Sequence, residues 1–420
     1  MTTDEQQVKK SFITRAALFC VFAFAVLFVE RTLRYNFLFT CTYRMQTVST
    51  YVPILCSWCI YAAFIVFVIV KKGRISWGAI IPYIIIYLGY LVSTLINNAN
   101  FDRWKDALIY SLPPLLLTAM AMSDEFSSKI FVKAATWVFT AMAALNILFE
   151  LVPSMWTLIS EWRNECFLGY HTLIGWPLTM GLMFALLDVR YNGRKWLAAI
   201  YIVLFFTNIA YKRPGGAVIG ALFILLWLVF PFVKKLFIKW PLEAFVLISL
   251  ALFAILMWCF EPFVNFAPIK AFIENVLHRD VTLSGRLYVW DGVKKIVAES
   301  PLIGYGFGES TQIFYESSQW NGGMVHAHNM FLQCLYEGGA VTLALGLVML
   351  FYTSRNAVSL CKRGLSRDER KTNGGIFKLI IFVLLIMLQS DQDAYYNWYM
   401  LAFVCNMYLI TSGSCNGKKN

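Results

Sequence analysis

Apolar segments of about the length needed to cross a bilayer follow one another along nearly the whole chain of 420 residues. Because backbone polar groups in lipid must be satisfied within helices, this succession predicts an all-α polytopic membrane protein with about twelve transmembrane helices, give or take two. The predicted segments are 12–29, 51–70, 77–96, 107–122, 130–149, 172–188, 196–211, 217–233, 241–260, 329–353, 376–390 and 395–411.

The composition agrees with a lipid environment. The chain is 59% hydrophobic and 14% charged, with a mean hydropathy of +0.62. Soluble proteins average about 45–50% apolar and about 25% charged residues. These values exclude a soluble globular domain and a disordered chain.

The net charge of +12 raises the possibility of nucleic-acid binding, but the charges follow the membrane topology. With both termini in the cytoplasm, the inner side carries 23 basic and 8 acidic residues, and the outer side 13 basic and 16 acidic. This asymmetry is the positive-inside rule, so no nucleic-acid partner is needed. The first segment follows Lys9, Lys10 and Arg15 without a small-residue cleavage site, which predicts an uncleaved signal anchor.

One connection is much longer than the others. It divides the single integral-membrane domain into transmembrane segments at 1–260, an outer loop at 261–328 and further segments with a cytoplasmic tail at 329–420. The loop holds three of the four histidines: His278, His326 and His328. Loops of this length in compact proteins are usually functional. The loop is therefore predicted to face the periplasm or exterior and to carry the active site.

Within this loop, apolar residues recur at helical spacing after Ser284, a candidate cap, and they end before Pro301. The recurring positions are Leu287, Trp290, Val293 and Val297. They predict an amphipathic helix at the outer interface, with Arg286 in its first turn and Lys294 and Lys295 facing water or lipid headgroups. The glycine-punctuated segment 301–308 follows, either as a plain turn or as part of the site. It is no dinucleotide fingerprint, because no strand precedes it.

A second cluster lies between the seventh and eighth predicted segments. Lys212 and Arg213 are placed on the outer side, where the positive-inside rule disfavours them. Pro214 suits the first turn of the next helix, whose amino terminus then faces outward. Arg213 and Arg286 would each lie at a helix amino terminus, and such a pair can bind diphosphate. The alternative is that they pair with outer carboxylates such as Glu261 or Asp291.

Two histidines stand at the outer end of the tenth segment. An imidazole, with an ordinary pKa of about 6.5, can accept a proton from a sugar hydroxyl at neutral pH. His326 and His328, followed by Asn329, could serve in this way or simply form satisfied interfacial hydrogen bonds. Zinc is disfavoured because no third ligand stands at a suitable spacing. Asp391 and Asp393 could imitate a metal-binding Asp-x-Asp, but sugar hydrogen bonding or loop solvation is favoured, so we predict no metal site.

Taken in order, these features resemble the bacterial O-antigen ligase and polymerase superfamily. The resemblance covers about 213–342 and rests on Arg213 at a helix start, Ser284-Gly-Arg286-x-x-x-Trp290, Pro301-Leu-x-Gly304-x-Gly306-x-Gly308, His326-Ala-His328-Asn329 and Gly339-x-x-Thr342. Each motif alone is weak. The four motifs that follow Arg213, in this order on the predicted outer side, are fairly specific.

The resemblance implies an integral-membrane glycosyltransferase of the GT-C type that needs neither metal nor cofactor. Its donor would be a glycan on undecaprenyl diphosphate, and its acceptor another lipid-linked glycan or a lipid A core. Arg213 and Arg286 would bind the donor diphosphate, and His328 would contact or deprotonate the acceptor hydroxyl. The remaining candidates for substrate binding are Lys212, His326, Asn329, Trp290, Asp391 and Asp393.

Three functions are compatible with these features. Polymerisation of O-antigen, capsular or exopolysaccharide is the leading expectation, because nothing in the sequence points to a lipid A acceptor. Ligation to lipid A core is the alternative, and a chain-length regulator or flippase could be a partner. A transporter or flippase for an anionic glycolipid would instead predict internal repeats and charges near the bilayer midplane, and neither is visible.

Overall fold

The computed structural model describes residues 43–70, 77–121, 125–152, 165–170, 174–275, 285–310, 313, 326–360, 367–390, 398 and 401–407. These residues are helical apart from short connections and a small antiparallel hairpin of β1 (Glu165–Cys166) and β2 (Gly169–Tyr170). The protein is an all-α membrane protein, as the sequence predicts. The first half contains α2 (Tyr43–Val70), η1 (Trp77–Ala79), α3 (Ile81–Ile96), α4 (Phe101–Ala121), α5 (Glu125–Leu151), α7 (Gly175–Asn192) and α8 (Lys195–Lys212). The second half contains α9 (Gly215–Val229), α10 (Pro231–Lys239), α11 (Leu242–Trp258), α12 (Phe260–Asn265), α13 (Ala267–Asn275), α14 (Arg286–Glu299), α16 (Met330–Leu360), α17 (Arg367–Met387) and η2 (Leu388–Ser390).

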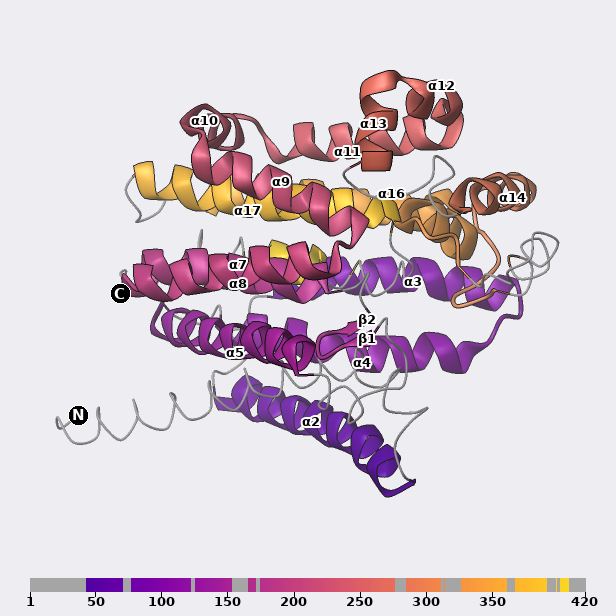
Figure 1. The fold of residues 1–420 in the computed structure, drawn as a ribbon. Helices are drawn as coiled ribbons and strands as arrows, with labels where there is room; N and C mark the ends of the chain where they lie inside the picture. Colours follow the sequence, from indigo (N-terminus) through magenta and orange to yellow (C-terminus); the bar gives the residue numbers. More distant parts are fainter. Residues whose placement is uncertain are drawn as a thin grey trace.

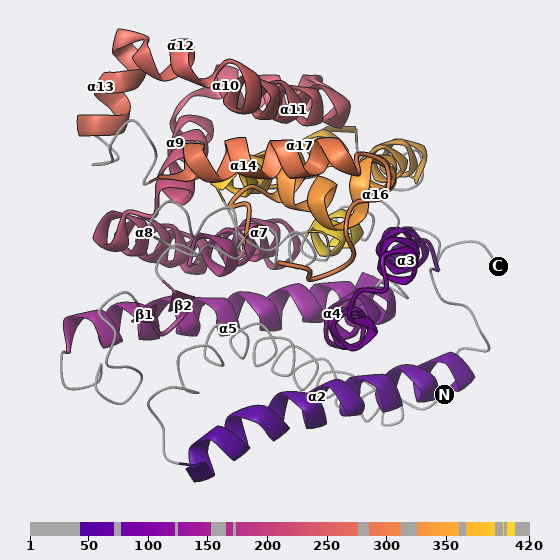
Figure 2. The ribbon, with the colours of Figure 1, turned by 90° about the vertical axis from the view of Figure 1, so that its right-hand side faces the viewer.

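The helices are stacked in layers (Figures 1 and 2). Helix α2 lies at one face, followed by α4 and α5, then α3, α7 and α8, then α9, α14, α16 and α17, with α10 to α13 at the opposite face. Helices far apart in sequence pack side by side, notably α3 with α16 and α7 with α17. The core therefore lies in the middle layers, where most of α7 and residues 373–387 of α17 are buried.

Each segment predicted between residues 51 and 390 overlaps a described helix. The segment 12–29 lies outside the described residues, and 395–411 is described only at 398 and 401–407. By length and apolarity alone, two described helices could each cross a membrane, Ser128–Leu151 and Met330–Arg355, and a third if the bent pair α9 and α10 counts as one span. The count of about twelve spans stays a prediction, because several helices are shorter than a perpendicular crossing requires.

The predicted segment 217–233 was wrong at its carboxyl end. Helix α9 stops at Val229, and α10 leaves it at an angle of 105°. Pro231 explains the break, since proline has no N–H to donate and its ring clashes with the carbonyl four residues earlier. The basic residues of this connection lie on α10, where Lys234 stacks over the Trp227 ring with Nζ 5.0 Å from its centroid.

Helix α4 continues through Pro113 and Pro114, so the prediction of a helix here is confirmed. A proline at position 113 cannot donate to the carbonyl of Ile109. The Tyr61 hydroxyl of α2 donates to that carbonyl at 2.6 Å instead. A neighbouring helix thus satisfies the backbone group that the proline leaves, as the bilayer interior requires.

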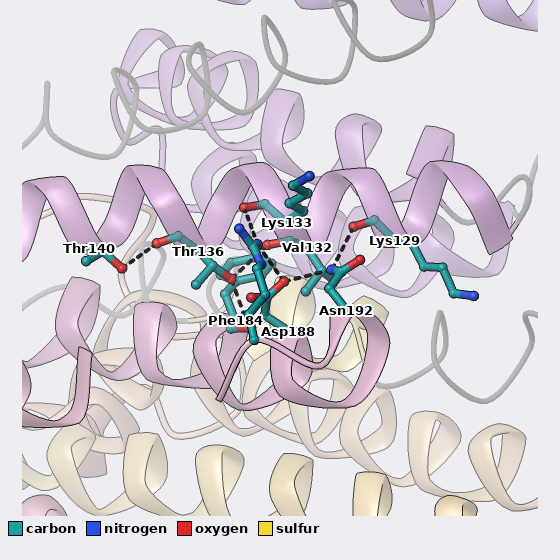
Figure 3. A network of polar contacts seen from close by, with 9 residues as sticks. Lys129, Val132, Lys133, Thr136, Thr140, Phe184, Asp188 and Asn192 are labelled. Atoms are coloured by element: carbon teal, nitrogen blue, oxygen red, sulfur yellow. Dashed lines mark hydrogen bonds and ion pairs between the residues drawn. The ribbon is translucent and has the colours of Figure 1, made fainter. Parts of the chain in front are cut away.

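A buried polar network fastens α5 to the turn between α7 and α8 (Figure 3). Asp188, which is fully buried, accepts hydrogen bonds from Arg194 and Asn192, each at 2.7 Å. Arg194 also donates to the carbonyl of Lys133 at 3.2 Å. A buried carboxylate is tolerable because it is paired with a guanidinium and hydrogen-bonded.

Helix α16 is interrupted at Gly339, whose φ of 67° and ψ of −174° are not helical. In an unbroken helix, the carbonyls of Tyr336 and Glu337 would accept from the N–H groups of Ala340 and Val341. The glycine-punctuated segment 301–308 takes over both sets of partners.

On one side of the break, Tyr305 N–H donates to the Tyr336 carbonyl at 2.8 Å, and Gly306 N–H donates to the Glu337 carbonyl at 2.9 Å. On the other side, Ala340 N–H donates to the Pro301 carbonyl at 2.8 Å, and Val341 N–H donates to the Leu302 carbonyl at 3.2 Å. The loop therefore replaces the two hydrogen bonds that the helix gives up.

This close approach requires glycine on both sides. A Cβ on Gly304 would lie 2.5 Å from the Tyr336 carbonyl oxygen, and a Cβ on Gly339 would lie 2.2 Å from the Leu302 carbonyl oxygen. Both residues also have left-handed φ values, 73° and 67°, which favour glycine. Of the two interpretations of this motif, the structure favours a role in the fold, although as an insertion into a helix rather than a plain turn.

Candidate functional site

Helix α14 carries the first candidate arginine. It begins at Arg286, with Gly285 in a left-handed conformation at the N-cap. The predicted cap Ser284 lies outside the described residues. Arg286 is therefore in the first turn, as predicted, beside backbone N–H groups that suit an anion.

The buried face of α14 differs in detail from the prediction. Val289, Trp290, Val293 and Ile296 are buried, whereas the predicted Leu287 and Val297 are half-buried. The prediction that Lys294 faces water or headgroups was wrong. Its Nζ donates to the Met257 carbonyl at the end of α11, at 2.7 Å, and pairs with Asp291 at 2.6 Å. Lys295 is exposed, as predicted.

Trp290 connects α14 to the two histidines. It is 2% exposed, and its Nε1–H donates to the carbonyl of Ala327 at 2.9 Å. Ala327 is fully buried between His326 and His328, which are both half-buried. This bond joins the histidine segment 326–329 to the helix that begins with Arg286, and a contact of Trp290 with substrate stays a prediction.

Asn329 fixes the other end of this segment. Its Oδ1 accepts from the N–H groups of Phe331 and Leu332 at 3.0 and 3.1 Å, which caps the amino terminus of α16. Its Nδ2 donates to the Gln389 carbonyl and side-chain oxygen at 3.2 and 3.1 Å. Asn329 is fully buried, and these bonds give it a structural role, while its role in substrate binding stays a prediction.

Arg213 lies at the junction of two helices. It is the C-cap of α8, and Pro214 is the N-cap of α9. The sequence predicted Pro214 in the first turn of α9, which begins one residue later. The Arg213 side chain is exposed, and its Nε donates back to the Ala210 carbonyl at 3.3 Å. In the predicted topology, this junction is the outward-facing start of α9.

Two of the candidate residues have an uncommon backbone conformation. Among the described residues, the non-glycine residues with positive φ are Asn98, Arg213 and His328, at 51°, 47° and 50°. A side chain in this region costs roughly 1–2 kcal/mol per residue, and such strain concentrates at functional sites. The predicted diphosphate ligand and the predicted base are both held in this way.

Lys212 is already paired. Its Nζ lies 2.9 Å from Glu150 Oε1 on α5, and the two side chains are only 13% and 5% exposed. Cys166 of β1 lies beside the pair, and burial raises the pKa of its thiol. On the predicted topology, the pairing accounts for a lysine on the outer side, where the positive-inside rule disfavours it. It also leaves Arg213 as the cation of this connection that faces solvent.

The start of α9 and the start of α16 converge on η2. Gly175, the first residue of α7, lies close to both α9 and η2. A Cβ on Gly175 would lie 2.6 Å from the Ala217 Cβ of α9 and 2.7 Å from Met387, which immediately precedes η2. Gln389 of η2 holds Asn329 and in turn donates to Ser249 of α11. The structure thus brings the histidine segment close to α9, which follows Arg213, and to α14, which begins with Arg286. A shared cavity for the three side chains stays a prediction.

The last two candidates are the aspartates that follow η2. Asp391 and Asp393 lie outside the described residues. Within the described part of the chain, no group of three or more His, Cys, Asp or Glu side chains could hold a metal ion. Sequence reasoning missed Glu150 and Gln389, because their partners lie far away in the chain. It also missed Gln333, although its partner Glu337 follows four residues later on the same helix.

Comparison with known proteins shows what these residues are similar to. The sequence family described as O-antigen ligase matches residues 198–347. This part of the chain is similar to O-antigen ligases. The matched part contains Arg213, Arg286, His328 and the broken helix at Gly339, so the resemblance inferred from the sequence motifs is confirmed.

The relatives are provisionally named polysaccharide ligases of Rickettsia. The chain is 26% identical to one from Rickettsia conorii over 282 residues, which cover 64% of this chain and 59% of the relative. It is 25% identical to one from Rickettsia felis over the same shares, and 24% identical to one from Rickettsia bellii over 74% and 68%. The chain therefore spans about 59% of the length of the first two relatives.

Proposed function

We propose that this protein transfers a glycan from undecaprenyl diphosphate to an acceptor hydroxyl on the outer face of the bacterial cytoplasmic membrane. The observation that carries the proposal is the joint placement of Arg286 and the histidine segment. A buried hydrogen bond from Trp290 to Ala327 joins them within the part of the chain that matches the O-antigen ligase family. The left-handed backbone of Arg213 and His328 supports the same site.

The chemistry follows from these residues. The acceptor hydroxyl oxygen attacks the anomeric carbon, the bond from that carbon to the diphosphate breaks, and the hydroxyl proton passes to His328. Configuration inverts, as expected of direct displacement without a covalent sugar intermediate. Negative charge grows on the departing diphosphate, and Arg213 and Arg286, already oriented by helix ends, stabilise that charge more than the ground state. The donor supplies the energy, and no metal is required.

Ligation is the form of the reaction that the comparisons favour, because the matched family and the named relatives are ligases. The acceptor would then be a lipid A core. Polymerisation onto a second lipid-linked glycan is the second candidate, because the sequence features that define the site are shared by both activities and nothing in the chain identifies a lipid A acceptor.

The test uses purified protein and a defined undecaprenyl-diphosphate oligosaccharide without added metal. Release of undecaprenyl diphosphate with transfer only when lipid A core is supplied indicates a ligase. Longer lipid-linked chains from the donor alone indicate a polymerase. Movement of intact donor across a vesicle membrane without bond cleavage would refute the proposal and favour a transporter. Loss of all activity in EDTA would refute metal independence and direct attention to Asp391 and Asp393.

The orientation belongs to the same proposal. We infer about twelve spans, both termini in the cytoplasm, and α14 on the outer side. Single cysteines replacing Lys295 on α14 and Lys235 on α10 test this, since both positions are exposed. An impermeant maleimide added to intact cells should label position 295 and not position 235. The reverse pattern would overturn the orientation and place the site on the wrong side for the donor.

A further inference from the structure

A line of buried hydrogen bonds runs from α16 back to the histidine segment. Ala327 N–H donates to Gln333 Oε1 at 2.7 Å, and Gln333 Nε2 donates to Glu337 Oε1 at 3.0 Å. Gln333 and Glu337 are 1% and 4% exposed. Their spacing of four places both side chains on one face of the helix. Neither residue belongs to the set that binds substrate or transfers a proton in the proposed reaction.

The direction of each bond in this line is fixed by chemistry. A backbone N–H can only donate, so Gln333 must present its oxygen to Ala327. The side-chain nitrogen of Gln333 then faces residue 337, which must accept, and a carboxylate accepts with both oxygens. Glu337 therefore sets the orientation of the Gln333 amide, and the Gln333 amide holds the backbone of the residue that precedes His328.

We propose that Gln333 and Glu337 are positioning residues for His328, an inference that rests on the proposed glycan transfer for its kinetic consequence. Ala327 is held at both ends of its backbone, by Gln333 at its N–H and by Trp290 at its carbonyl. Asn329 is held by η2. His328 lies between these two fixed residues in a left-handed conformation, φ 50°, so its imidazole is presented by a backbone with little freedom to relax.

An exchange of the two side chains tests the proposal. In Gln333→Glu, two carboxylates face each other unless one takes up a proton, which costs free energy at neutral pH. Glu337→Gln alone can still present an oxygen to Gln333 and should be mild. The double variant Gln333→Glu with Glu337→Gln restores every bond, because the carboxylate now at position 333 accepts both from Ala327 N–H and from the amide now at position 337. The prediction is therefore that the second substitution rescues the first.

The expected kinetics separate positioning from binding. Gln333→Glu should lower kcat about tenfold, the effect of one lost buried hydrogen bond, while the KM for the lipid-linked donor changes little. The double variant should return to within about threefold of the wild type. A matched control is Glu243→Gln, which alters another carboxylate that accepts a side-chain hydrogen bond, from Ser354 at 3.0 Å, near the opposite end of α16. It should leave kcat unchanged.

A second measurement does not depend on activity. Hydrogen exchange read by mass spectrometry on peptides that contain residues 326–329 reports the Ala327 amide. Gln333→Leu removes its acceptor and should speed its exchange about tenfold, whereas the double variant should exchange like the wild type. If Gln333→Glu does not fold, the double variant must still fold and show protected exchange.

The outcomes distinguish the positioning role of Gln333 and Glu337 from the proposed glycan transfer. A double variant as impaired as Gln333→Glu, or a Gln333→Leu variant with unchanged exchange and unchanged kcat, overturns the positioning role. If the wild type transfers no glycan but the amide exchange of the variants follows the prediction, the proposed function is overturned. The structural role of Gln333 and Glu337 is then still supported.

Discussion

The substitution Gly339→Ala should be far more damaging than Gly193→Ala, although both glycines have nearly the same φ, 67° and 71°. Gly193 ends α7, and a Cβ there would meet nothing within 4 Å. Gly339 breaks α16, and its Cβ would lie 2.2 Å from both the carbonyl carbon and the oxygen of Leu302. The pair shares the cost of a positive φ and differs in the inserted loop and in ψ, which is 7° at Gly193 and −174° at Gly339.

The magnitude follows from the backbone bonds at the break. Both substitutions cost roughly 1–2 kcal/mol for a side chain at left-handed φ. At Gly339 the clash is with backbone, so the segment 301–306 must move, and it makes four backbone hydrogen bonds to α16. At about 1 kcal/mol each, their loss adds about 4 kcal/mol. The ψ of −174° at Gly339 is also in a region that only glycine occupies readily.

Detergent-solubilised protein provides the assay. With about 1 °C of Tm per kcal/mol for a chain of 420 residues, the apparent Tm of Gly339→Ala should lie about 4 °C below that of Gly193→Ala. Gly304→Ala is an independent variant on the loop side of the same contact and should behave like Gly339→Ala.

Equal apparent Tm values for Gly339→Ala and Gly193→Ala would refute the reasoning, because the shared φ cost would then be the whole effect. A drop in Gly339→Ala without a drop in Gly304→Ala would show that the conformation of Gly339, and not the inserted loop, carries the stability. Either result would also remove the structural explanation for the glycine-punctuated motif.

Three further predictions concern charged and reactive groups. Arg286→Ala should lower turnover about 10²-fold or more by removing stabilisation of the leaving diphosphate, while Lys295→Ala, exposed on the same helix, should leave the rate of undecaprenyl diphosphate release unchanged. Glu150→Gln leaves the Lys212 ammonium buried without its carboxylate and should cost about 3–5 kcal/mol in a denaturation experiment, most of which the double variant with Lys212→Met should recover. Burial raises the pKa of Cys166, so its thiol stays protonated and its alkylation, followed by mass spectrometry, should remain slow as the pH rises from about 7 to about 9; labelling as fast as that of an exposed cysteine would contradict the structure.

The helices could be predicted because lipid makes hydropathy the dominant signal. The apolar runs mark α4 and α16 without any knowledge of their partners. Hydropathy gives no turn angle, however, so the run at 217–233 hid the bend at Pro231. A closer reading of Pro231 as a helix start would have divided that segment, since proline is favoured at the first helical position.

The site could be predicted only in part. Its residues form local sequence motifs, but most of the residues that they contact lie far away in the chain. Arg286 in a first turn and the histidines before α16 follow from spacing alone. The pairing of Lys212 with Glu150 joins α8 to α5, and the bond from Trp290 to Ala327 joins α14 to the segment before α16. Such contacts depend on how helices pack, and a single sequence does not encode that packing as a periodicity.

Glu337 joins two motifs that are separate signals in the sequence. Its backbone carbonyl accepts from Gly306 N–H at 2.9 Å and from the Ser93 hydroxyl at 2.7 Å, and its carboxylate accepts from Gln333. The inserted loop therefore holds the same turn of α16 that orients the Gln333 amide and, through it, the residue before His328. A substitution in the loop that spares folding should then lower kcat in the same way as Gln333→Glu, without weakening binding of the donor diphosphate. Loss of donor binding instead would place the loop in the anion site and separate it from the histidine segment.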